Sequence, residues 1–186
     1  SGENHAEINA IEDVFSNLGN KSKEALKESE LFVNLEPCTT FGKTAPCANP
    51  ISEDGIKKVY FGNEDKEQQG FSKMHPGIEV ESGLLEEEGR KLNRGFFSRI
   101  EKGRPYISCK IASALDGGIA LPSGESKWIT SSDSRKDVHK IRAYSDAILT
   151  GTGTIKIDNP QLTSRDSGLE EGSYKQPLRV VVDRNN

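Results

Sequence analysis

The sequence predicts an α/β protein, because short apolar runs with strand character alternate with helical segments along the chain. The strand-like runs are LFVNL, IKKVYFGN, RPYISCKIAS, DAILTG and PLRVVVD, at residues 31–35, 56–63, 104–113, 146–151 and 177–183. Apolar residues recur at helical spacing in residues 6–18 and 83–103, and residues 132–145 indicate a third helix. This alternation predicts strands that are connected through helices.

Local signals set the boundaries of several predicted elements. Gly19 ends the helix at residues 6–18, since glycine terminates helices readily. Ser132 or Asp133 is predicted to cap the third helix. Residues 62–82 are polar, with scattered glycines and one proline, which predicts a mobile connection or short strand-and-turn units.

Composition narrows the class of protein and its partners. The 186 residues suffice for one domain or two small ones, and the net charge of −4 gives no basic field for nucleic acid. A local basic pocket for a phosphorylated small molecule stays possible. No apolar run reaches the length of a membrane span, and no signal peptide is visible. Three cysteines without disulfide-framework spacing favour a reducing compartment, so we expect a cytoplasmic location.

One histidine, one glutamate and two cysteines supply the groups of a catalytic zinc site. Such a site needs about three protein ligands and one open position for water, and His5, Cys38 and Cys47 supply that number. Glu7 lies two residues after His5, close to the metal without having to ligate it. A carboxylate there is placed to take a proton from water and deliver it to a leaving amine.

Zinc deaminases carry H-x-E followed by P-C-x-x-C. HAE and the PC dipeptide at 37–38 match, but the second cysteine comes nine positions after the first, which indicates an inserted loop. H-x-E alone is common, and free cysteines are often simply buried. A structural zinc would need a fourth ligand, for which His75 and His139 are candidates outside any ligand-like motif. We interpret both as surface or capping residues.

The combined motifs NHAEINAI and NLEPCTTFGKTAPCANPI resemble the deaminase domain of the bifunctional riboflavin-biosynthesis deaminase–reductases. The resemblance implies His5, Cys38 and Cys47 as zinc ligands and Glu7 as proton donor in a cytidine-deaminase-like α/β/α domain. The family's loop has roughly the form E-P-C-x-H-x-G-R/K-T-P-P-C. Thr40 replaces its histidine, which keeps hydrogen bonding but loses a ring, and Ala45 replaces a proline.

From residue 104 on, the chain resembles the reductase half of the same family. The segments that carry this resemblance are, in order, RPYISCKIASALDGGIA, GESKWIT, RKDVHKIRAYSDAILTGTGTIKIDNPQLTSR and QPLRVVVD. A phosphorylated pyrimidine substrate needs arginine forks and hydroxyls, which Arg142, Arg165 and Ser126 can supply. LTGTGT follows a predicted strand and offers a turn for a nicotinamide cofactor, but it lacks the G-x-G-x-x-G fingerprint.

The resemblance implies a dihydrofolate-reductase-like α/β domain that transfers hydride from NADPH to the ribose C1′ and so forms a ribityl chain. Substrate contacts are implied at Ser126, Arg142 and Arg165. Cofactor contacts are implied at Ala112, Trp128, Thr154, Asp158, Leu162 and Arg184.

Two residues of this half are candidates for its acid–base chemistry. Lys110 can supply a cation near the reacting centre, and Asp158 can exchange a proton. The plainer alternatives are a lysine that extends along an apolar strand to reach water and an aspartate that starts a turn. Cys109 is interpreted as a small buried residue without a role, and the position of Gly118 more often carries a cation in the family.

The resemblance divides the chain into a deaminase domain at 1–82, a connecting helix at 83–103 that Gly89 interrupts, and a reductase domain at 104–186. It does not cover the family's whole length, so we expect both domains to be incomplete and the polypeptide alone to be poorly stable and weakly active. For the full-length enzyme we expect a homo-oligomer that binds a phosphorylated pyrimidine and neither nucleic acid nor membrane.

Two alternatives stay open. The first is a stand-alone zinc deaminase for a base or nucleotide with a non-catalytic C-terminal segment. The second is a non-enzymatic interaction domain that zinc stabilises, against which Glu7 argues, because a structural zinc has no use for a proton shuttle.

Overall fold

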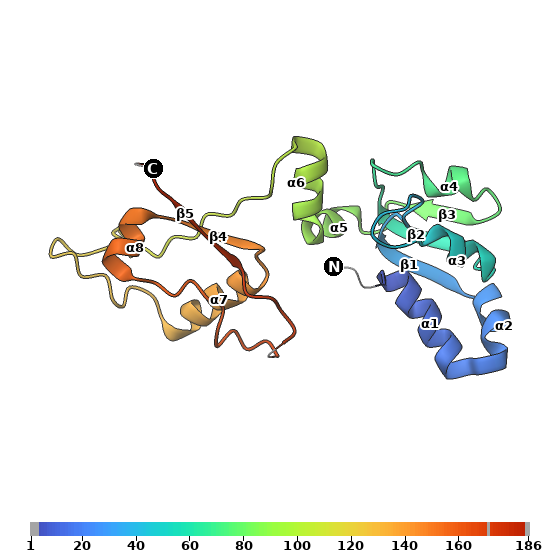
Figure 1. Cartoon of the computed structure of the whole chain (residues 1–186), viewed down its shortest axis with the longest axis horizontal. Helices are drawn as coiled ribbons and strands as arrows, with labels where there is room; N and C mark the ends of the chain where they lie inside the picture. Colours follow the sequence, from blue (N-terminus) through green and yellow to red (C-terminus); the bar gives the residue numbers. More distant parts are fainter. Residues whose placement is uncertain (1–3, 171, 185–186) are drawn as a thin grey trace. The chain divides into compact units, whose positions relative to one another are not determined.

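The computed structural model describes residues 4–170 and 172–184 of the chain. The backbone divides into two compact units, Ser1–Ser108 and Cys109–Asn186, and each is described by itself (Figure 1). Both units combine helices with parallel strands, which confirms the α/β class predicted from the sequence. Within the described residues, no helix has the length and apolar character needed to cross a membrane.

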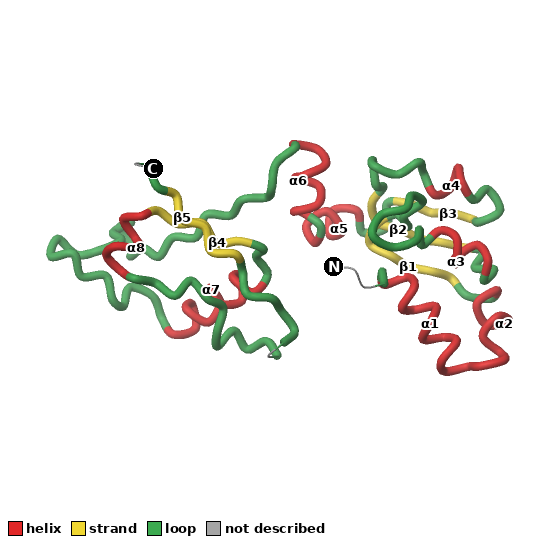
Figure 2. The backbone as a smooth tube through the Cα atoms, in the orientation of Figure 1, coloured by secondary structure: helices red, strands yellow, loops and turns green. Residues whose placement is uncertain are grey.

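A three-stranded parallel sheet forms the centre of the first unit (Figure 2). Its strands are β1 (Glu30–Leu35), β2 (Lys58–Asn63) and β3 (Glu79–Ser82), in that order. Val33 pairs with Phe61, and Val59 pairs with Val80. Alternate residues therefore share a face, and this register places apolar side chains of all three strands on one side of the sheet. The region predicted as strand-and-turn units supplies β3.

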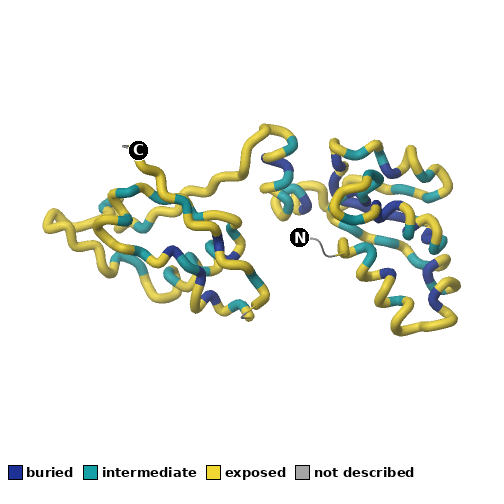
Figure 3. The backbone as a smooth tube through the Cα atoms, in the orientation of Figure 1, coloured by how far each residue is buried: buried dark blue, intermediate teal, exposed yellow. Residues whose placement is uncertain are grey.

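The core of the first unit lies against that apolar face. It is covered by α1 (Ala6–Leu18), α2 (Ser22–Lys27), α3 (Ala48–Glu53) and α4 (Phe71–Met74). The buried cluster consists of Ile11, Leu26, Cys47, Ala48, Ile51, Ile56, Val59, Phe61 and Phe71. Figure 3 shows buried backbone concentrated in this region. Because Cys47 belongs to the cluster, one candidate zinc ligand is fixed directly by core packing.

The first helix ends where the sequence predicts. Gly19 has φ 54°, and its N–H donates to the carbonyl of Phe15. A short 3₁₀ turn, η1 (Gly19–Lys21), follows and leads into α2. The buried Ser22 hydroxyl then donates to the Gly19 carbonyl at 2.6 Å. This tight corner returns the chain toward the sheet.

Residues 83–103 form two helices, α5 (Glu86–Leu92) and α6 (Arg94–Lys102), and both belong to the first unit. The predicted interruption at Gly89 is wrong, because the break comes at Asn93, between the helices. Gly89 lies inside α5 and is buried. A Cβ atom there would lie 2.3 Å from Asn63 Oδ1, so the glycine serves close packing against the end of β2.

The second unit contains a two-stranded parallel sheet of β4 (Ala147–Gly151) and β5 (Leu178–Val182). Helix α7 (Ser132–Ala143) precedes β4, and α8 (Thr152–Asp158) follows it. Ser131 caps α7, since its hydroxyl accepts from the Ser134 N–H at 3.2 Å. The prediction of Ser132 or Asp133 as the cap is therefore wrong by one or two positions.

The predicted strand at residues 104–113 is absent from the structure, which assigns these described residues to no helix or strand apart from a bend at 104. A strand needs a hydrogen-bonded neighbour, and the segment pairs with neither β4 nor β5. Cys109 is consequently exposed, and the prediction that it is buried is wrong. Lys110, which was expected on that strand, lies instead on this irregular and exposed segment.

Candidate metal centre and cationic cluster

The start of α1 places His5 and Glu7 beside each other. His5 is the N-cap residue, with extended backbone at φ −70° and ψ 160°, and Glu7 lies in the first helical turn. A negative side chain in this turn is favoured by the positive end of the helix dipole. The HAE triplet therefore presents an imidazole and a carboxylate from one short, well-defined piece of backbone.

The two cysteines reach the same place from the loop between β1 and α3. Cys38 lies three residues after the end of β1, and Cys47 is the N-cap residue of α3. The Cys47 N–H donates to Cys38 Sγ at 3.2 Å, and the Ala48 N–H donates to the Cys38 carbonyl at 3.1 Å. These two bonds close the loop and hold the thiols side by side.

The three predicted ligands converge. His5 Nδ1 lies 3.6 Å from Cys38 Sγ and 3.2 Å from Cys47 Sγ, and the three ligand atoms all lie within 4.8 Å of one another. Donors placed tetrahedrally around one zinc ion are about 3.5 to 3.8 Å apart, given bonds of about 2.0 and 2.3 Å to nitrogen and sulfur. The spacing and the donor set therefore fit zinc, and three ligands leave a fourth position free.

The electrostatics of the site point the same way. Burial raises the pKa of the Cys47 thiol far above its usual value, and the negative charge of Glu7 and contact with Cys38 raise this pKa further. Glu7 is thus close enough to affect Cys47, as the predicted proton shuttle must be. Thiols that are buried among negative groups gain most from a cation, because a bound metal stabilises their thiolate forms.

A buried carboxylate that the sequence did not reveal supports the metal loop, which is the segment between β1 and α3 that carries Cys38 and Cys47. Glu36, two residues before Cys38, is 8% exposed. Its carboxylate oxygens accept from the N–H groups of Asp65 at 3.0 Å and Phe71 at 2.5 Å. The only signal in the sequence was a glutamate beside the Pro-Cys dipeptide. Its role depends on residues about thirty positions away.

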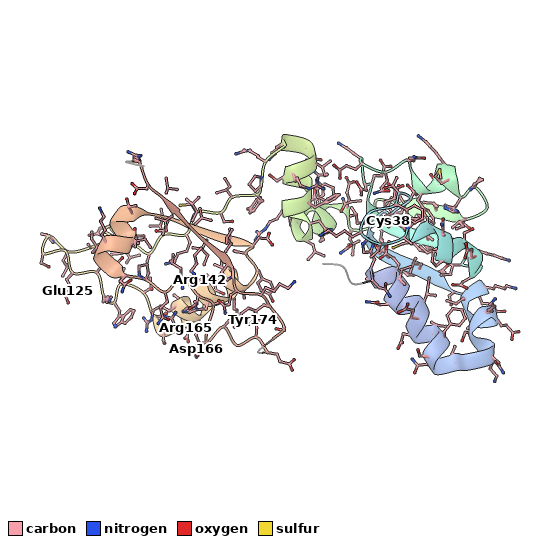
Figure 4. All side chains as sticks on the ribbon, in the orientation of Figure 1. Cys38, Glu125, Arg142, Arg165, Asp166 and Tyr174 are labelled. Atoms are coloured by element: carbon pink, nitrogen blue, oxygen red, sulfur yellow. The ribbon has the colours of Figure 1, made fainter. Side chains whose placement is uncertain are left out.

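Two of the predicted substrate contacts meet in the second unit. Arg142 Nη1 donates to the Thr163 carbonyl at 3.1 Å, and Arg165 Nη1 donates to Thr163 Oγ1 at 3.2 Å. Figure 4 shows Arg142, Arg165 and Asp166 in the same part of the unit. Burial and the neighbouring Arg165 charge lower the pKa of the Arg142 guanidinium. An anion bound between these arginines would relieve their mutual repulsion.

His139 joins this cluster and was not assigned a role from the sequence. Its Nδ1 lies 3.2 Å from the Thr163 carbonyl oxygen and 3.3 Å from the Arg165 backbone nitrogen. Burial lowers the pKa of His139, and the charges of Arg142 and Arg165 lower it further. The lowered pKa favours the neutral imidazole, whose Nδ1 can accept from the Arg165 N–H when that nitrogen carries no proton.

The other predicted reductase residues are spread over the second unit. Ser126 is exposed and lies in the loop before α7, and its neighbour Glu125 lies apart from Arg142 and Arg165 in Figure 4; its contact with the substrate stays a prediction. The exposed Trp128 packs against Arg135, whose guanidinium lies 4.3 Å from the ring centroid.

The remaining predicted contacts occupy varied positions. Thr154 and Asp158 lie on α8, with Asp158 its last residue, and Leu162 is buried with φ 55°. Arg184 is exposed beyond β5, whereas Lys110 and Ala112 lie on the irregular segment that precedes α7.

Comparisons with known proteins find two different family matches, one in each part of the chain. Residues 1–63 match the cytidine and deoxycytidylate deaminase zinc-binding region, and residues 105–186 match the RibD C-terminal domain. The riboflavin biosynthesis protein RibD of Aquifex aeolicus is 43% identical over 188 residues, which cover 98% of this chain and 49% of that protein. RibD of Escherichia coli is 39% identical over 199 residues, which cover 100% of this chain and 52% of that protein.

A similar solved structure is the diaminohydroxyphosphoribosylaminopyrimidine deaminase/5-amino-6-(5-phosphoribosylamino)uracil reductase of Thermotoga maritima. It is 42% identical with a TM-score of 0.85, and the match covers 99% of this chain and 51% of that one. RibD of Acinetobacter baumannii is 37% identical with a TM-score of 0.84. The chain thus spans about half the length of the relatives that it matches.

Proposed function

Because the chain belongs to the RibD family of riboflavin biosynthesis proteins, we propose that it takes part in two reactions of that pathway. The first unit is the zinc-dependent hydrolytic deaminase of a phosphoribosylamino-pyrimidine. The second unit carries residues of the NADPH-dependent reductase that converts the ribosyl group to ribityl. The observation that carries the proposal is the convergence of His5, Cys38 and Cys47 beside Glu7.

The residues of the first unit divide the deamination between them. His5, Cys38 and Cys47 would hold zinc, which supplies an activated water molecule when it is bound. Glu7 accepts a proton from the attacking water and delivers it to the amine, which leaves as ammonia. Water thereby adds its oxygen to the pyrimidine ring as the ring loses its amino group. The loop between β1 and α3 holds the two cysteines, and the start of α1 holds His5.

In the second unit, the two cationic side chains of Arg142 and Arg165, with the uncharged His139 beside them, support binding of the substrate phosphate. Two guanidinium groups near one loop match the bidentate geometry that phosphate oxygens prefer. NADPH supplies the hydride that reaches the ribose C1′, and the chain's own groups bind the two molecules and exchange protons. We keep Lys110 and Asp158 as the proposed acid–base groups, and Ser126 as a further substrate contact.

The proposed cofactor contacts lie on α8 and on the segments before α7, after α8 and after β5. They are Ala112, Trp128, Thr154, Asp158, Leu162 and Arg184. The family match over residues 105–186 supports a reductase role for this unit over a non-catalytic appendage. A cytoplasmic location and a homo-oligomeric full-length enzyme complete the proposal.

Metal content and assays of the two reactions, deamination and NADPH-dependent reduction, test the function together. The purified chain should bind about one zinc per molecule, and Cys47→Ser should lose it. Glu7→Gln should keep zinc but lose deamination of the phosphoribosylamino-pyrimidine by a factor of about 10² or more, since a positioned proton-transfer group contributes 10²–10⁴-fold. Oxidation of NADPH in the presence of the deaminated pyrimidine reports the second reaction.

Each outcome separates the alternatives. Zinc with deamination but no NADPH oxidation would indicate a deaminase alone. Zinc in both the wild-type chain and Glu7→Gln, with equal rates of deamination in the two, would indicate a structural metal and would overturn the proposed function of the first unit. Both assays are also run on a relative of full length, such as the protein of Escherichia coli, as the positive control.

A further inference from the structure

The side-chain amide of Gln68 lies at the centre of a group of hydrogen bonds beside the metal centre. Its Oε1 atom lies 2.9 Å from the Thr39 N–H nitrogen and 3.1 Å from the Thr40 N–H nitrogen. The hydroxyl oxygens of the same two threonines lie 3.2 and 3.0 Å from it. Thr39 and Thr40 directly follow the predicted ligand Cys38, so one oxygen gathers all the donors of this dipeptide.

These contacts fix the orientation of the amide. A backbone N–H can only donate, so the atom that faces two such groups must be the oxygen of Gln68 and not its nitrogen. The amide oxygen has two lone pairs, which the two backbone donors fill, and the threonine hydroxyls share the same acceptor. The opposite end, Nε2, then donates to Asp65 Oδ2 at 3.3 Å.

The loop that carries Gln68 is itself anchored next to the metal loop. Asp65 is 9% exposed, and its carboxylate accepts from the Glu67 N–H at 2.9 Å. The Asp65 N–H in turn donates to the buried carboxylate of Glu36 at 3.0 Å. A second hydrogen bond joins the two loops, because the Gln69 N–H donates to Thr39 Oγ1 at 3.3 Å. Glu36 and Thr39 flank Cys38, so the 65–69 loop holds the backbone on both sides of this ligand.

The residues beyond Thr40 have no comparable support. Phe41 is 80% exposed, and Gly42 and Lys43 are exposed as well. Ordering the backbone of a single residue costs about 1–2 kcal/mol of conformational entropy. Without the Gln68 contacts, the weakly supported stretch would extend back through Thr40 and Thr39. Cys38 would then keep its bonds from the Cys47 and Ala48 N–H groups but lose the support that follows it in the chain.

We propose that Gln68 is a positioning residue of the zinc site, which preorganises the Cys38 ligand through Thr39 and Thr40. The inference rests on the proposed zinc-dependent function of the first unit and concerns how that site is kept in shape. Groups that orient metal ligands from outside the coordination sphere typically contribute 10- to 100-fold to metal affinity. Gln68 and the two threonines are about thirty residues apart in the sequence, so only the folded chain brings them into contact.

Zinc release gives a direct test that does not depend on turnover. In Gln68→Met the side chain keeps its length but loses both polar atoms. The expected result is release of zinc to a chromogenic chelator about 10-fold faster or more than in the wild-type chain. The matched control is Gln69→Met, since the Gln69 side chain is exposed and its contact with Thr39 uses only the backbone. Equal release rates in the two variants would overturn the inference.

Failure of this inference can be told apart from failure of the proposed function. A wild-type chain that binds no zinc contradicts the deaminase site itself. A wild-type chain that binds zinc, with unchanged release in Gln68→Met, contradicts only the role of Gln68. Circular dichroism of both variants tests whether they keep the wild-type fold.

Hydrogen exchange keeps the inference testable if Gln68→Met does not fold. In the wild-type chain the amide protons of Thr39 and Thr40 should exchange at least about 10-fold more slowly than that of the exposed Phe41, because a hydrogen-bonded amide must open before it exchanges. Exchange of all three at the same rate would show that the amide of Gln68 does not hold the loop, and the inference would be overturned.

Discussion

Gly89 lies where α5 approaches the side chain of Asn63 at the end of β2. A Cβ atom on Gly89 would lie 2.3 Å from Asn63 Oδ1, which is buried and has no hydrogen-bond partner among the described residues. Gly89→Ala should therefore destabilise the chain by about 1–3 kcal/mol, the usual cost of overpacking. Urea unfolding measures this change.

The control for this prediction is Gly95→Ala in α6, where a Cβ atom would meet nothing within 4 Å. That variant should be neutral or stabilising by up to about 1 kcal/mol, because alanine favours helices over glycine. Similar effects of the two substitutions would contradict the close packing of α5 against Asn63.

His139 predicts how the stability of the second unit depends on pH. Its pKa is lowered in the folded chain by burial and by Arg142 and Arg165. The unfolded chain therefore binds a proton first, at about pH 6.5, and the folded chain binds it only at lower pH. Stability should be complete above about pH 6.5 and should fall as the pH decreases through the folded pKa.

The variant His139→Gln isolates this contribution. Glutamine cannot titrate, so the decrease in the melting temperature of the second unit between pH 7 and pH 5 should become smaller. Thermal unfolding at several pH values measures it. An unchanged dependence on pH would mean that the imidazole is not held neutral by the two arginines.

The candidate site shows which residues a sequence can reveal. HAE and the spaced cysteines are local patterns with a chemical meaning, so His5, Glu7, Cys38 and Cys47 could be predicted as a group, and the structure brings the three ligands together. Gln68 carries no such pattern. It acts on Thr39 and Thr40 across about thirty residues, and only the fold places these groups in contact.

At the scale of elements, an ion pair at the surface links α5 and α6. Arg90 Nη2 on α5 lies 2.8 Å from both carboxylate oxygens of Glu101 on α6. The hydrogen bond and charge of Arg90 lower the pKa of Glu101. The break between the two helices at Asn93 lets these two charged partners meet.

The pair gives a prediction with a defined sign. A carboxylate with a lowered folded pKa adds stability above its ordinary pKa of about 4.3, and this stability is lost as the pH falls through the folded value. Glu101→Gln should therefore lower the melting temperature at pH 7 and leave it nearly unchanged near pH 3. The difference at pH 7 should shrink in 1 M NaCl, since salt screens exposed pairs.

Elements were predictable where the local pattern and the tertiary contacts agree. Helix α1 has both an apolar stripe and a terminating glycine, and its predicted bounds match the structure. The 104–113 segment has strand character, but a strand exists only through its partner, and here neither β4 nor β5 provides one. Gly89 reads as a helix breaker because the sequence does not show Asn63 packed against it.

At the scale of the whole chain, the two units differ in how much apolar surface they bury. The first unit has a continuous core of nine buried residues. Among the described residues of the second unit, only Ala143, Leu162 and Pro177 are buried apolar residues. Large apolar side chains stay exposed in the second unit, on the sheet and on the segment before α7, including Ile111, Leu149, Leu178 and Val181. The second unit should therefore unfold at lower temperature.

Zinc should act on one of these two unfolding steps and not on the other. A ligand that binds only the folded state adds RT ln(1 + [L]/Kd), which is about 2.7 kcal/mol at a hundredfold excess over Kd. The three predicted zinc ligands all lie in the core-bearing first unit, and Cys47 belongs to its buried cluster. In calorimetric scans, zinc should raise the upper transition by several degrees and leave the lower one in place, and a chelator should reverse the shift. The variant Cys47→Ser should abolish the shift, while Cys109→Ser, at an exposed position of the second unit, should preserve it. A single transition that moves as a whole with zinc would show that the two units unfold as one cooperative body, and the division of stability between them would then be wrong.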